Sequence, residues 1–353
     1  MRIAILGSVA LPVPPPRQGG TEWIAYYQAE GLSKLGHEVI LFAARGSKQG
    51  SYKLVEVGGG NTVAGSSLSV EHEEEYIESS RKLRLENVYL ARAMQKLIDL
   101  QGEYDIILNN MRGEAVFIPI ARKLNKPFAN VMHLPHFSEL ASFFQETKTH
   151  IVTISNAQRK GFPDLNYLAT VNNCVSLDEF KFNPKPQDYL LMVGSIAPHK
   201  NQEGAIRIAK KLGLNLVLAG KIGDKEYFKK IQKDIDGEKI EWVGELGFEA
   251  KHRLYQNAKA FIFPILWEEP FGLVMIEAMA CGTPVVAFAN GAIPEVVKDG
   301  YSGYVIQNND EFRFTEALEN IGRIKRENCR KHAEDNFSVE KMVKDYEGAL
   351  KKL

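Results

Sequence analysis

The strongest constraint on the fold is a regular alternation between short apolar runs and longer stretches with helical spacing. Residues 2–6 form an apolar run typical of a buried strand, and Thr21 is a suitable N-cap for a following helix that ends at Gly36. A second apolar run, Glu38–Ala43, follows this helix directly. A strand, a helix and a second strand in this order predict one unit of a parallel sheet.

The same alternation continues along the chain and is interrupted by a polar stretch that contains Pro184 and Pro186. Further strands are predicted at 104–108, Phe128–Met132 and 150–154, and after the interruption at Tyr189–Val193, Asn215–Ala219, 240–243, Ala260–Phe263 and Val285–Phe288. Because 353 residues are too many for one ordinary core, we expect two doubly wound α/β domains, at 1–183 and 184–336. A last helix within 337–353 is apolar on one face, so it must cover another part of the protein.

Composition excludes several classes of protein. Basic and acidic residues number 44 each, and neither half of the chain is basic, which argues against nucleic-acid binding. The three cysteines, Cys174, Cys281 and Cys329, are too far apart for a zinc motif or a disulfide framework, and they favour a cytoplasmic location. No apolar run is long enough to span a membrane.

A peripheral membrane contact and the oligomeric state stay open at this stage. A solvated amphipathic helix and a surface for anionic lipid are both consistent with one group of basic residues, Arg81, Lys82, Arg84, Arg92 and Lys96.

The most informative segment is 267–284, which lies between two apolar strand runs and therefore forms a strand-to-helix turn at the carboxyl edge of a sheet. Pro270 and Gly272 are suited to enter a helix, which leaves free N–H groups at 272–274. Such N–H groups bind phosphate. Glu269 and Glu277 flank this position, and carboxylates accept hydrogen bonds from sugar or ribose hydroxyls. The alternative is that both are ordinary acids near a helix start.

These residues closely resemble glycosyltransferase family 4. The resemblance rests on the two glutamates with seven residues between them, on Glu-Pro-Phe-Gly-Leu-Val and on Ala-Met-Ala-Cys-Gly-Thr-Pro-Val-Val. It extends to 291–297, 299–304 and 172–180. The resemblance implies a GT-B fold, meaning two facing Rossmann-like domains, with the C-terminal helix crossing back onto the first. It also implies a retaining transferase that takes a sugar from a nucleotide sugar to a hydroxyl acceptor without a metal or a resident cofactor.

The resemblance assigns roles to residues of the second domain. Glu269 contacts the transferred sugar, Glu277 the ribose, and the N–H groups of 272–274 the diphosphate. Lys200 is the family's phosphate-binding lysine, whereas Ser195 replaces an arginine, and Lys221 and Arg17 are the candidates to compensate for its loss. The nucleobase is placed beside 220–222 and 244–246, with uridine favoured. The predicted donor residues are Gly19, Gly20, Ser195, Lys200, Lys221, Gly244, Leu246, Glu269, Phe271, Gly272, Leu273, Val274 and Glu277.

The first domain is expected to bind the acceptor. Gly19 and Gly20 allow the backbone to approach a phosphate closely. His133 ends a strand and matches a family histidine near the sugar, so that His133, Lys200 and Glu269 are the predicted catalytic residues. The candidate acceptor contacts are Arg17, Asn109, Asn110, Arg112 and His136. A metal site at His136 and Glu139 is disfavoured because Pro135 breaks helical spacing.

Three other functions remain possible from the sequence. A glycoside hydrolase would use the two glutamates as nucleophile and acid/base. A nucleotide-sugar epimerase also has two Rossmann-like domains. A non-catalytic sensor of sugar nucleotides is suggested by the missing arginine at Ser195.

Overall fold

A computed structural model describes residues 1–16, 19–59 and 79–353. These residues divide into two compact units. Unit 1 consists of Met1–Ile154, Arg159–Val171 and Met342–Leu353, and unit 2 of Ser155–Gln158 and Asn172–Lys341. The chain enters unit 2 briefly at Ser155–Gln158, returns to unit 1 at Arg159 and passes into unit 2 again at Asn172, ahead of the boundary expected after residue 183.

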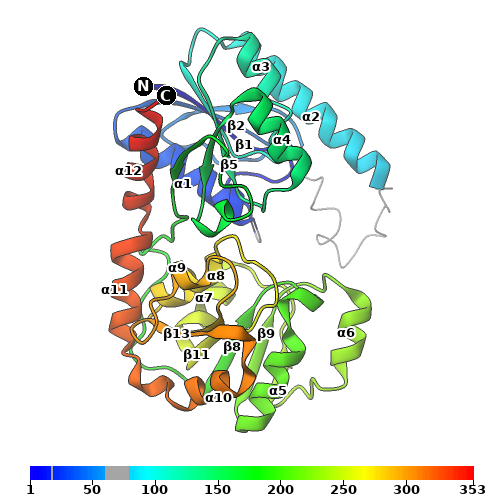
Figure 1. The fold of residues 1–353 in the computed structure, drawn as a ribbon, viewed down its shortest axis with the longest axis vertical. Helices are drawn as coiled ribbons and strands as arrows, with labels where there is room; N and C mark the ends of the chain where they lie inside the picture. Colours follow the sequence, from blue (N-terminus) through cyan, green and yellow to red (C-terminus); the bar gives the residue numbers. More distant parts are fainter. Residues whose placement is uncertain (17–18, 60–78) are drawn as a thin grey trace. The chain divides into compact units, whose positions relative to one another are not determined.

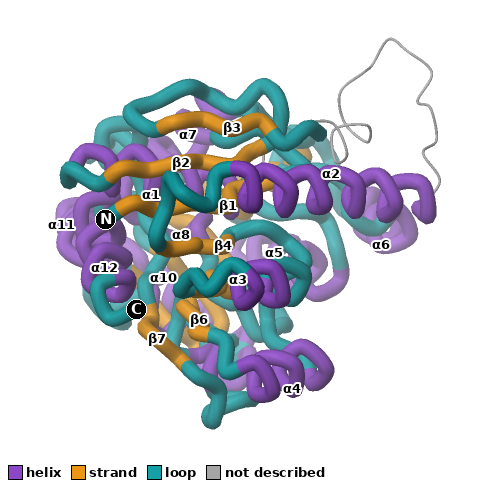
Figure 2. The backbone as a smooth tube through the Cα atoms, turned by 90° about the horizontal axis from the view of Figure 1, so that it is seen from above, coloured by secondary structure: helices purple, strands orange, loops and turns teal. Residues whose placement is uncertain are grey.

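Unit 1 contains a parallel sheet of seven strands in the order β3-β2-β1-β4-β5-β6-β7, of which Figure 2 labels all but β5. The strands are β1 (Arg2–Ser8), β2 (Glu38–Ala43), β3 (Lys53–Glu56), β4 (Ile106–Asn109), β5 (Phe128–Met132), β6 (His150–Thr153) and β7 (Tyr167–Thr170). The helices are α1 (Gly20–Lys34), α2 (Ser79–Asp99), α3 (Ile118–Lys123), α4 (Ser138–Thr147) and α12 (Val339–Leu350). Helix α12 and the short 3₁₀ turn η2 (Ala157–Arg159) both begin in unit 2.

The C-terminal helix α12 packs against α1, as Figure 1 shows. Its apolar face buries Met342, Val343 and Tyr346. A Cβ atom on Gly31 of α1 would lie only 2.2 Å from Val343 Cγ2, so the two helices approach too closely there for any side chain on Gly31. The helix therefore completes unit 1, as expected from its apolar face.

Unit 2 contains a parallel sheet of six strands in the order β10-β9-β8-β11-β12-β13. The strands are β8 (Tyr189–Val193), β9 (Asn215–Ala219), β10 (Ile240–Trp242), β11 (Ala260–Phe263), β12 (Val285–Phe288) and β13 (Gly303–Ile306). The helices are η3 (Pro198–Lys200), α5 (Gln202–Leu212), α6 (Lys225–Gln232), α7 (Phe248–Asn257), α8 (Leu273–Ala280), α9 (Ile293–Val296), η4 (Gln307–Asn309), α10 (Glu311–Glu319), η5 (Ile321–Arg323) and α11 (Arg326–Phe337).

Both sheets reverse their strand order next to the first strand, between β1 and β4 in unit 1 and between β8 and β11 in unit 2. In doubly wound sheets, ligands bind at the carboxyl ends of the strands beside this reversal, called the switch point. The predicted doubly wound α/β architecture is confirmed, and the switch points indicate where functional groups are to be sought.

One prediction about local structure is wrong. Thr21 does not cap α1, because the helix already begins at Gly20 and its N-cap is Gly19. Gly19 has a φ of +156°, a backbone conformation that disfavours a side chain, so the helix starts in the glycine pair rather than after it. No helix among the described residues has the length and apolar character needed to cross a bilayer.

Candidate functional site

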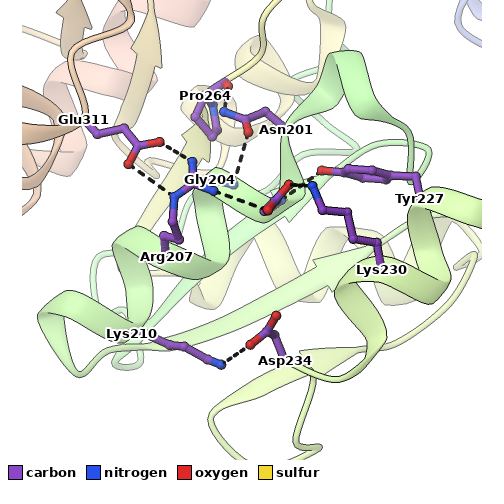
Figure 3. Close-up of polar contacts among 10 residues, drawn as sticks. Asn201, Gly204, Arg207, Lys210, Tyr227, Lys230, Asp234, Pro264 and Glu311 are labelled. Carbon is purple, nitrogen blue, oxygen red and sulfur yellow. Dashed lines mark hydrogen bonds and ion pairs between the residues drawn. The ribbon is translucent and has the colours of Figure 1, made fainter.

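Lys200 lies in the turn after β8, and Asn201 fixes this turn. Asn201 has a φ of +60°, which asparagine tolerates, and its Oδ1 caps α5 by accepting a hydrogen bond from Gly204 N at 3.1 Å. Its Nδ2 donates to Pro264 O at 2.8 Å, just after β11 (Figure 3). One buried amide thus ties together the loops on the two sides of the switch point.

Glu269 lies in the loop after β11, and two donors meet one of its oxygens. Lys200 Nζ is 3.1 Å from Oε2, and the indole Nε1 of Trp267 donates to the same oxygen at 3.0 Å. The Lys200 ammonium also lies 4.6 Å from the centre of the Trp267 ring, a cation–π contact. Only 15% of the Lys200 side chain and 12% of the Glu269 side chain are exposed, so this ion pair is poorly screened by water.

The loop after β12 holds the Glu269 backbone in place. Ala292 N donates to Glu269 O at 2.8 Å, and a Cβ atom on Gly291 would lie within 2.4 Å of Glu269 backbone atoms. Gly291 N donates to the Glu268 carboxylate at 2.7 Å. Only glycine permits this close approach, so Gly291 helps to position Glu269.

The N-terminus of helix α8 lies at the carboxyl edge of the unit 2 sheet. Gly272 is its N-cap at a φ of +90°, and no side chain in the described part of the protein caps this end of the helix. The backbone N–H groups of Leu273 and Val274, both half-buried, are therefore available to an anion. Phe271 differs from expectation, because its side chain is buried against Phe337 and only its backbone can face a ligand.

Glu277 lies one turn further along α8 and contacts two residues of α7. Lys251 Nζ lies 2.9 Å and 3.1 Å from the two carboxylate oxygens, and the Tyr255 hydroxyl donates to Oε2 at 2.8 Å. The sequence analysis did not identify Lys251 or Tyr255 as partners of Glu277. They lie 22 and 26 residues away from Glu277, and only their own four-residue spacing, which places them on one face of a helix, was available as a signal.

Glycines follow the neighbouring strands of this sheet. Gly220 N donates to Gly244 O at 2.7 Å, and a Cβ atom on Gly220 would lie 2.0 Å from Gly194 O. Ser195 is half-buried, and its carbonyl accepts from Gln202 Nε2 at 3.0 Å. The remaining donor candidates differ in exposure, with Lys221 exposed and Leu246 half-buried.

In unit 1, the loop after β1 surrounds a buried carboxylate that the sequence reading did not single out. Glu22 Oε1 accepts from Ser8 Oγ at 3.0 Å. Burial raises the pKa of this carboxyl group, opposed by its hydrogen bonds and by Arg112. A Cβ atom on Gly19 would lie 2.8 Å from Glu22 Oε2 and 2.6 Å from Pro15, so glycine is required beside this carboxylate.

His133 follows β5 and is held by a chain of amides. Its Nε2 lies 3.0 Å from Asn110 Oδ1, and Asn110 Nδ2 donates to Gln28 Oε1 at 2.7 Å. Because Oδ1 can only accept, Nε2 carries the proton, which leaves Nδ1 as an acceptor. Burial, with a smaller contribution from Arg112, lowers the pKa of His133 to about 4, so the imidazole is neutral at pH 7.

Two of the predicted acceptor contacts, Asn109 and His136, make their contacts inside unit 1. Asn109 is fully buried, and its side chain bonds to Asn130 and to the backbone of Met111, which fixes the end of β4. The His136 imidazole packs edge-on against Phe144, Phe162 and Tyr167. Both side chains serve the interior of unit 1. Arg17 lies outside the described residues.

Two doubly wound sheets, with polar groups gathered at the carboxyl edge of each, define a protein of GT-B architecture. Residues 176–336 match the family described as glycosyl transferases group 1.

Curated relatives share about half of the chain. An uncharacterized glycosyltransferase of Methanocaldococcus jannaschii is 30% identical over 175 residues, which are 47% of this chain and 48% of that protein. The O-antigen chain mannosyltransferase RfbU of Salmonella typhimurium is 27% identical over 184 residues, 50% of this chain and 51% of that protein. The chain therefore spans about half the length of these curated relatives.

Solved structures match along the whole chain. AviGT4, a glycosyltransferase involved in avilamycin A biosynthesis, superposes with a TM-score of 0.73 at 22% identity, covering 99% of this chain and 97% of that one. HepE of Anabaena in complex with UDP and glucose superposes with a TM-score of 0.73 at 16% identity, covering both chains completely. At these identities the likeness establishes the fold, and function has to be argued from the site.

Proposed function

We propose that the protein is a retaining glycosyltransferase that moves a sugar from a nucleoside-diphosphate sugar to a hydroxyl acceptor. The observation that carries the proposal is the arrangement at the switch point of unit 2. The start of α8 has free N–H groups, and Lys200 pairs with Glu269 in the loop that leads into this helix. Glu277 lies in α8 itself. This combination suits a diphosphate together with the hydroxyls of a sugar and a ribose.

In this proposal, Glu269 accepts from hydroxyls of the transferred sugar, Glu277 from the ribose, and Lys200 with the N–H groups of Leu273 and Val274 binds the diphosphate. The bond between the anomeric carbon and the phosphate oxygen breaks, and the acceptor oxygen bonds to the same face of that carbon. The acceptor proton passes to the leaving diphosphate. Negative charge grows on the diphosphate as the bond breaks, so Lys200 and the N–H groups stabilise the transition state most.

The contacts of the two glutamates support transfer over glycoside hydrolysis. A hydrolase needs one carboxyl group that keeps its proton and acts as a general acid. Here both carboxylates accept hydrogen bonds from a lysine ammonium, Glu269 from Lys200 and Glu277 from Lys251. Neither is arranged as a proton donor.

Uridine is the favoured base and unit 1 the favoured acceptor domain. The structural relative HepE of Anabaena is known in complex with UDP-glucose, superposing with a TM-score of 0.70. In unit 1, His133, Asn110 and Arg112 follow β4 and β5 next to its switch point, and we assign them to the acceptor. The family resemblance implies transfer without a metal, and we expect EDTA to leave transfer unchanged.

The test is a screen of UDP-, GDP- and ADP-sugars by thermal shift, followed by turnover with a panel of hydroxyl acceptors. We expect one donor to raise the melting temperature and to release nucleoside diphosphate only when an acceptor is present, with the anomeric configuration retained in the product. Cleavage of simple glycosides without any nucleotide would overturn the proposal in favour of a hydrolase. Tight binding without turnover across the panel would support a sensor instead.

A further inference from the structure

The carboxylate of Glu277 is held by a more elaborate set of contacts than a surface ion pair. Its Oε1 accepts from Lys251 Nζ, and its Oε2 accepts from both Lys251 Nζ and Tyr255 Oη. Tyr255 is fully buried, and 25% of the Lys251 side chain and 15% of the Glu277 side chain are exposed. These contacts therefore hold the carboxylate in one orientation while part of the Glu277 side chain stays exposed.

A carboxylate has about four lone-pair positions for hydrogen-bond donors. Contacts with described residues occupy three of them, one on Oε1 and two on Oε2. The remaining position is on Oε1, which is the oxygen not bonded to Tyr255. A single hydroxyl donor can complete the set.

Charge also favours this arrangement. Glu277 lies one turn from the free N–H groups at the start of α8, where the diphosphate is proposed to bind. An unpaired carboxylate at that distance would repel the diphosphate, whereas the Lys251 ammonium neutralises it. Lys251 and Tyr255 lie four residues apart on α7, which begins after β10 at the carboxyl edge of the sheet, so one helix face provides both contacts.

We infer that Lys251 and Tyr255 are positioning residues that aim Glu277 at a ribose hydroxyl of the donor and so make the site selective for ribonucleotides. The inference rests on the proposed function. The competing explanation is that the three residues only join α7 to α8. A purely structural role would affect all nucleotides equally, whereas a positioning role affects only ligands that have the ribose hydroxyls.

The experiment compares two ligands by titration calorimetry. The first is whichever of UDP, GDP and ADP raises the melting temperature most, and the second is its 2′,3′-dideoxy counterpart. We expect wild type to bind the ribonucleotide about tenfold tighter or more, because a hydrogen bond to a charged group is lost in the dideoxy ligand. Tyr255→Phe and Lys251→Met are expected to reduce this ratio to about threefold or less. Because a change in charge or in folded fraction alters the affinity for both ligands equally, it does not change the ratio of the two affinities.

Matched controls come from the same unit. Tyr189→Phe removes a hydroxyl that donates to Leu254 O on α7 at 2.7 Å, and Lys210→Met removes a surface partner of Asp234. Both are expected to keep the wild-type ratio. A wild-type ratio near one, or an unchanged ratio in both Tyr255→Phe and Lys251→Met, would overturn the inference and leave the transferase proposal standing. Failure of wild type to bind any nucleotide or nucleotide sugar would instead overturn the proposed function itself.

Discussion

Lys200 and Glu269 form an ion pair across the switch point of unit 2. Lys200 follows β8 and Glu269 follows β11, and these two strands are neighbours at the position where the strand order reverses. Their charged atoms are 3.1 Å apart, and both side chains are largely buried. The pair thus brings a cation and a carboxylate from separate loops to the position where open α/β sheets bind ligands.

Lys200→Ala is expected to lower kcat/KM for the donor by about tenfold or more, equivalent to about 1.4 kcal/mol of transition-state stabilisation. The ammonium lies 3.1 Å from Glu269 Oε2, and we assign it to the growing charge on the diphosphate. Steady-state release of nucleoside diphosphate measures the effect. Lys210→Ala, at an exposed pair with Asp234, serves as the control. Wild-type kinetics in the Lys200 variant would contradict the assigned role.

Trp267→Phe tests how Glu269 is oriented. The change keeps an aromatic ring beside Lys200 but removes the Nε1 hydrogen bond to Glu269 Oε2. One hydrogen bond to a charged group contributes about 1.5 kcal/mol or more, so we expect kcat/KM to fall about tenfold while the melting temperature stays within about 3 °C of wild type. Kinetics equal to those of Trp23→Phe, a change in unit 1, would show that the indole does not orient Glu269.

Arg326→Met is expected to destabilise unit 2 by about 3 kcal/mol or more. The buried guanidinium donates to the carbonyls of Asn183, Gln256, Ala258 and Cys281 and to Thr283 Oγ1. Methionine would remove all of these hydrogen bonds. The Cys281 and Gln256 carbonyls keep a second donor in Asn183, but each buried acceptor that loses its donor costs about 1–3 kcal/mol.

The Arg326 experiment is urea unfolding followed by tryptophan fluorescence in a Trp23→Phe background, in which the two remaining tryptophans, Trp242 and Trp267, report unit 2 alone. Arg207→Met is the control, because Arg207 makes an exposed pair with Glu311 (Figure 3), and such pairs contribute at most about 1 kcal/mol. Equal losses in the two variants would show that the Arg326 contacts add nothing beyond a surface pair.

Most strands of both sheets could be predicted because they are short apolar runs between helical stretches. The strands β7 and β13 were not predicted, because they are four residues long and only partly buried. The strands at Glu38–Ala43, Phe128–Met132 and Tyr189–Val193 have the predicted bounds. The helix start near Thr21 was misplaced because the positive φ of Gly19 already turns the chain into the helix, and sequence spacing does not reveal backbone torsion.

The site was only partly predictable, because a side chain's direction after a strand cannot be read from its position. Asn110 and Asn109 are adjacent, yet Asn110 reaches His133 whereas Asn109 bonds to Asn130 inside the sheet. Lys251 and Tyr255 were missed for a related reason, since the packing of α7 against α8 is a tertiary contact that no local pattern encodes.

His136 supplies a prediction about pH. Burial lowers the pKa of His136 to about 4, and neither ring nitrogen has a hydrogen-bond partner among the described residues. With an unfolded-state pKa near 6.5, the unfolded chain takes up a proton that the folded state excludes. This residue's contribution to stability is therefore complete above pH 6.5 and is lost as the pH falls towards 4. Between pH 7 and pH 5 the loss amounts to about 2 kcal/mol.

His136→Phe is accordingly expected to make the stability of unit 1 less sensitive to acid, with the difference in unfolding free energy between pH 7 and pH 5 smaller than in wild type by about 2 kcal/mol. Phenylalanine extends the set of rings formed by Phe144, Phe162 and Tyr167 and has no proton to gain. Urea unfolding at the two pH values gives the comparison, and using the difference removes any pH-independent change in packing. If the variant and wild type lose the same stability on acidification, His136 must already be protonated or exposed in the folded protein.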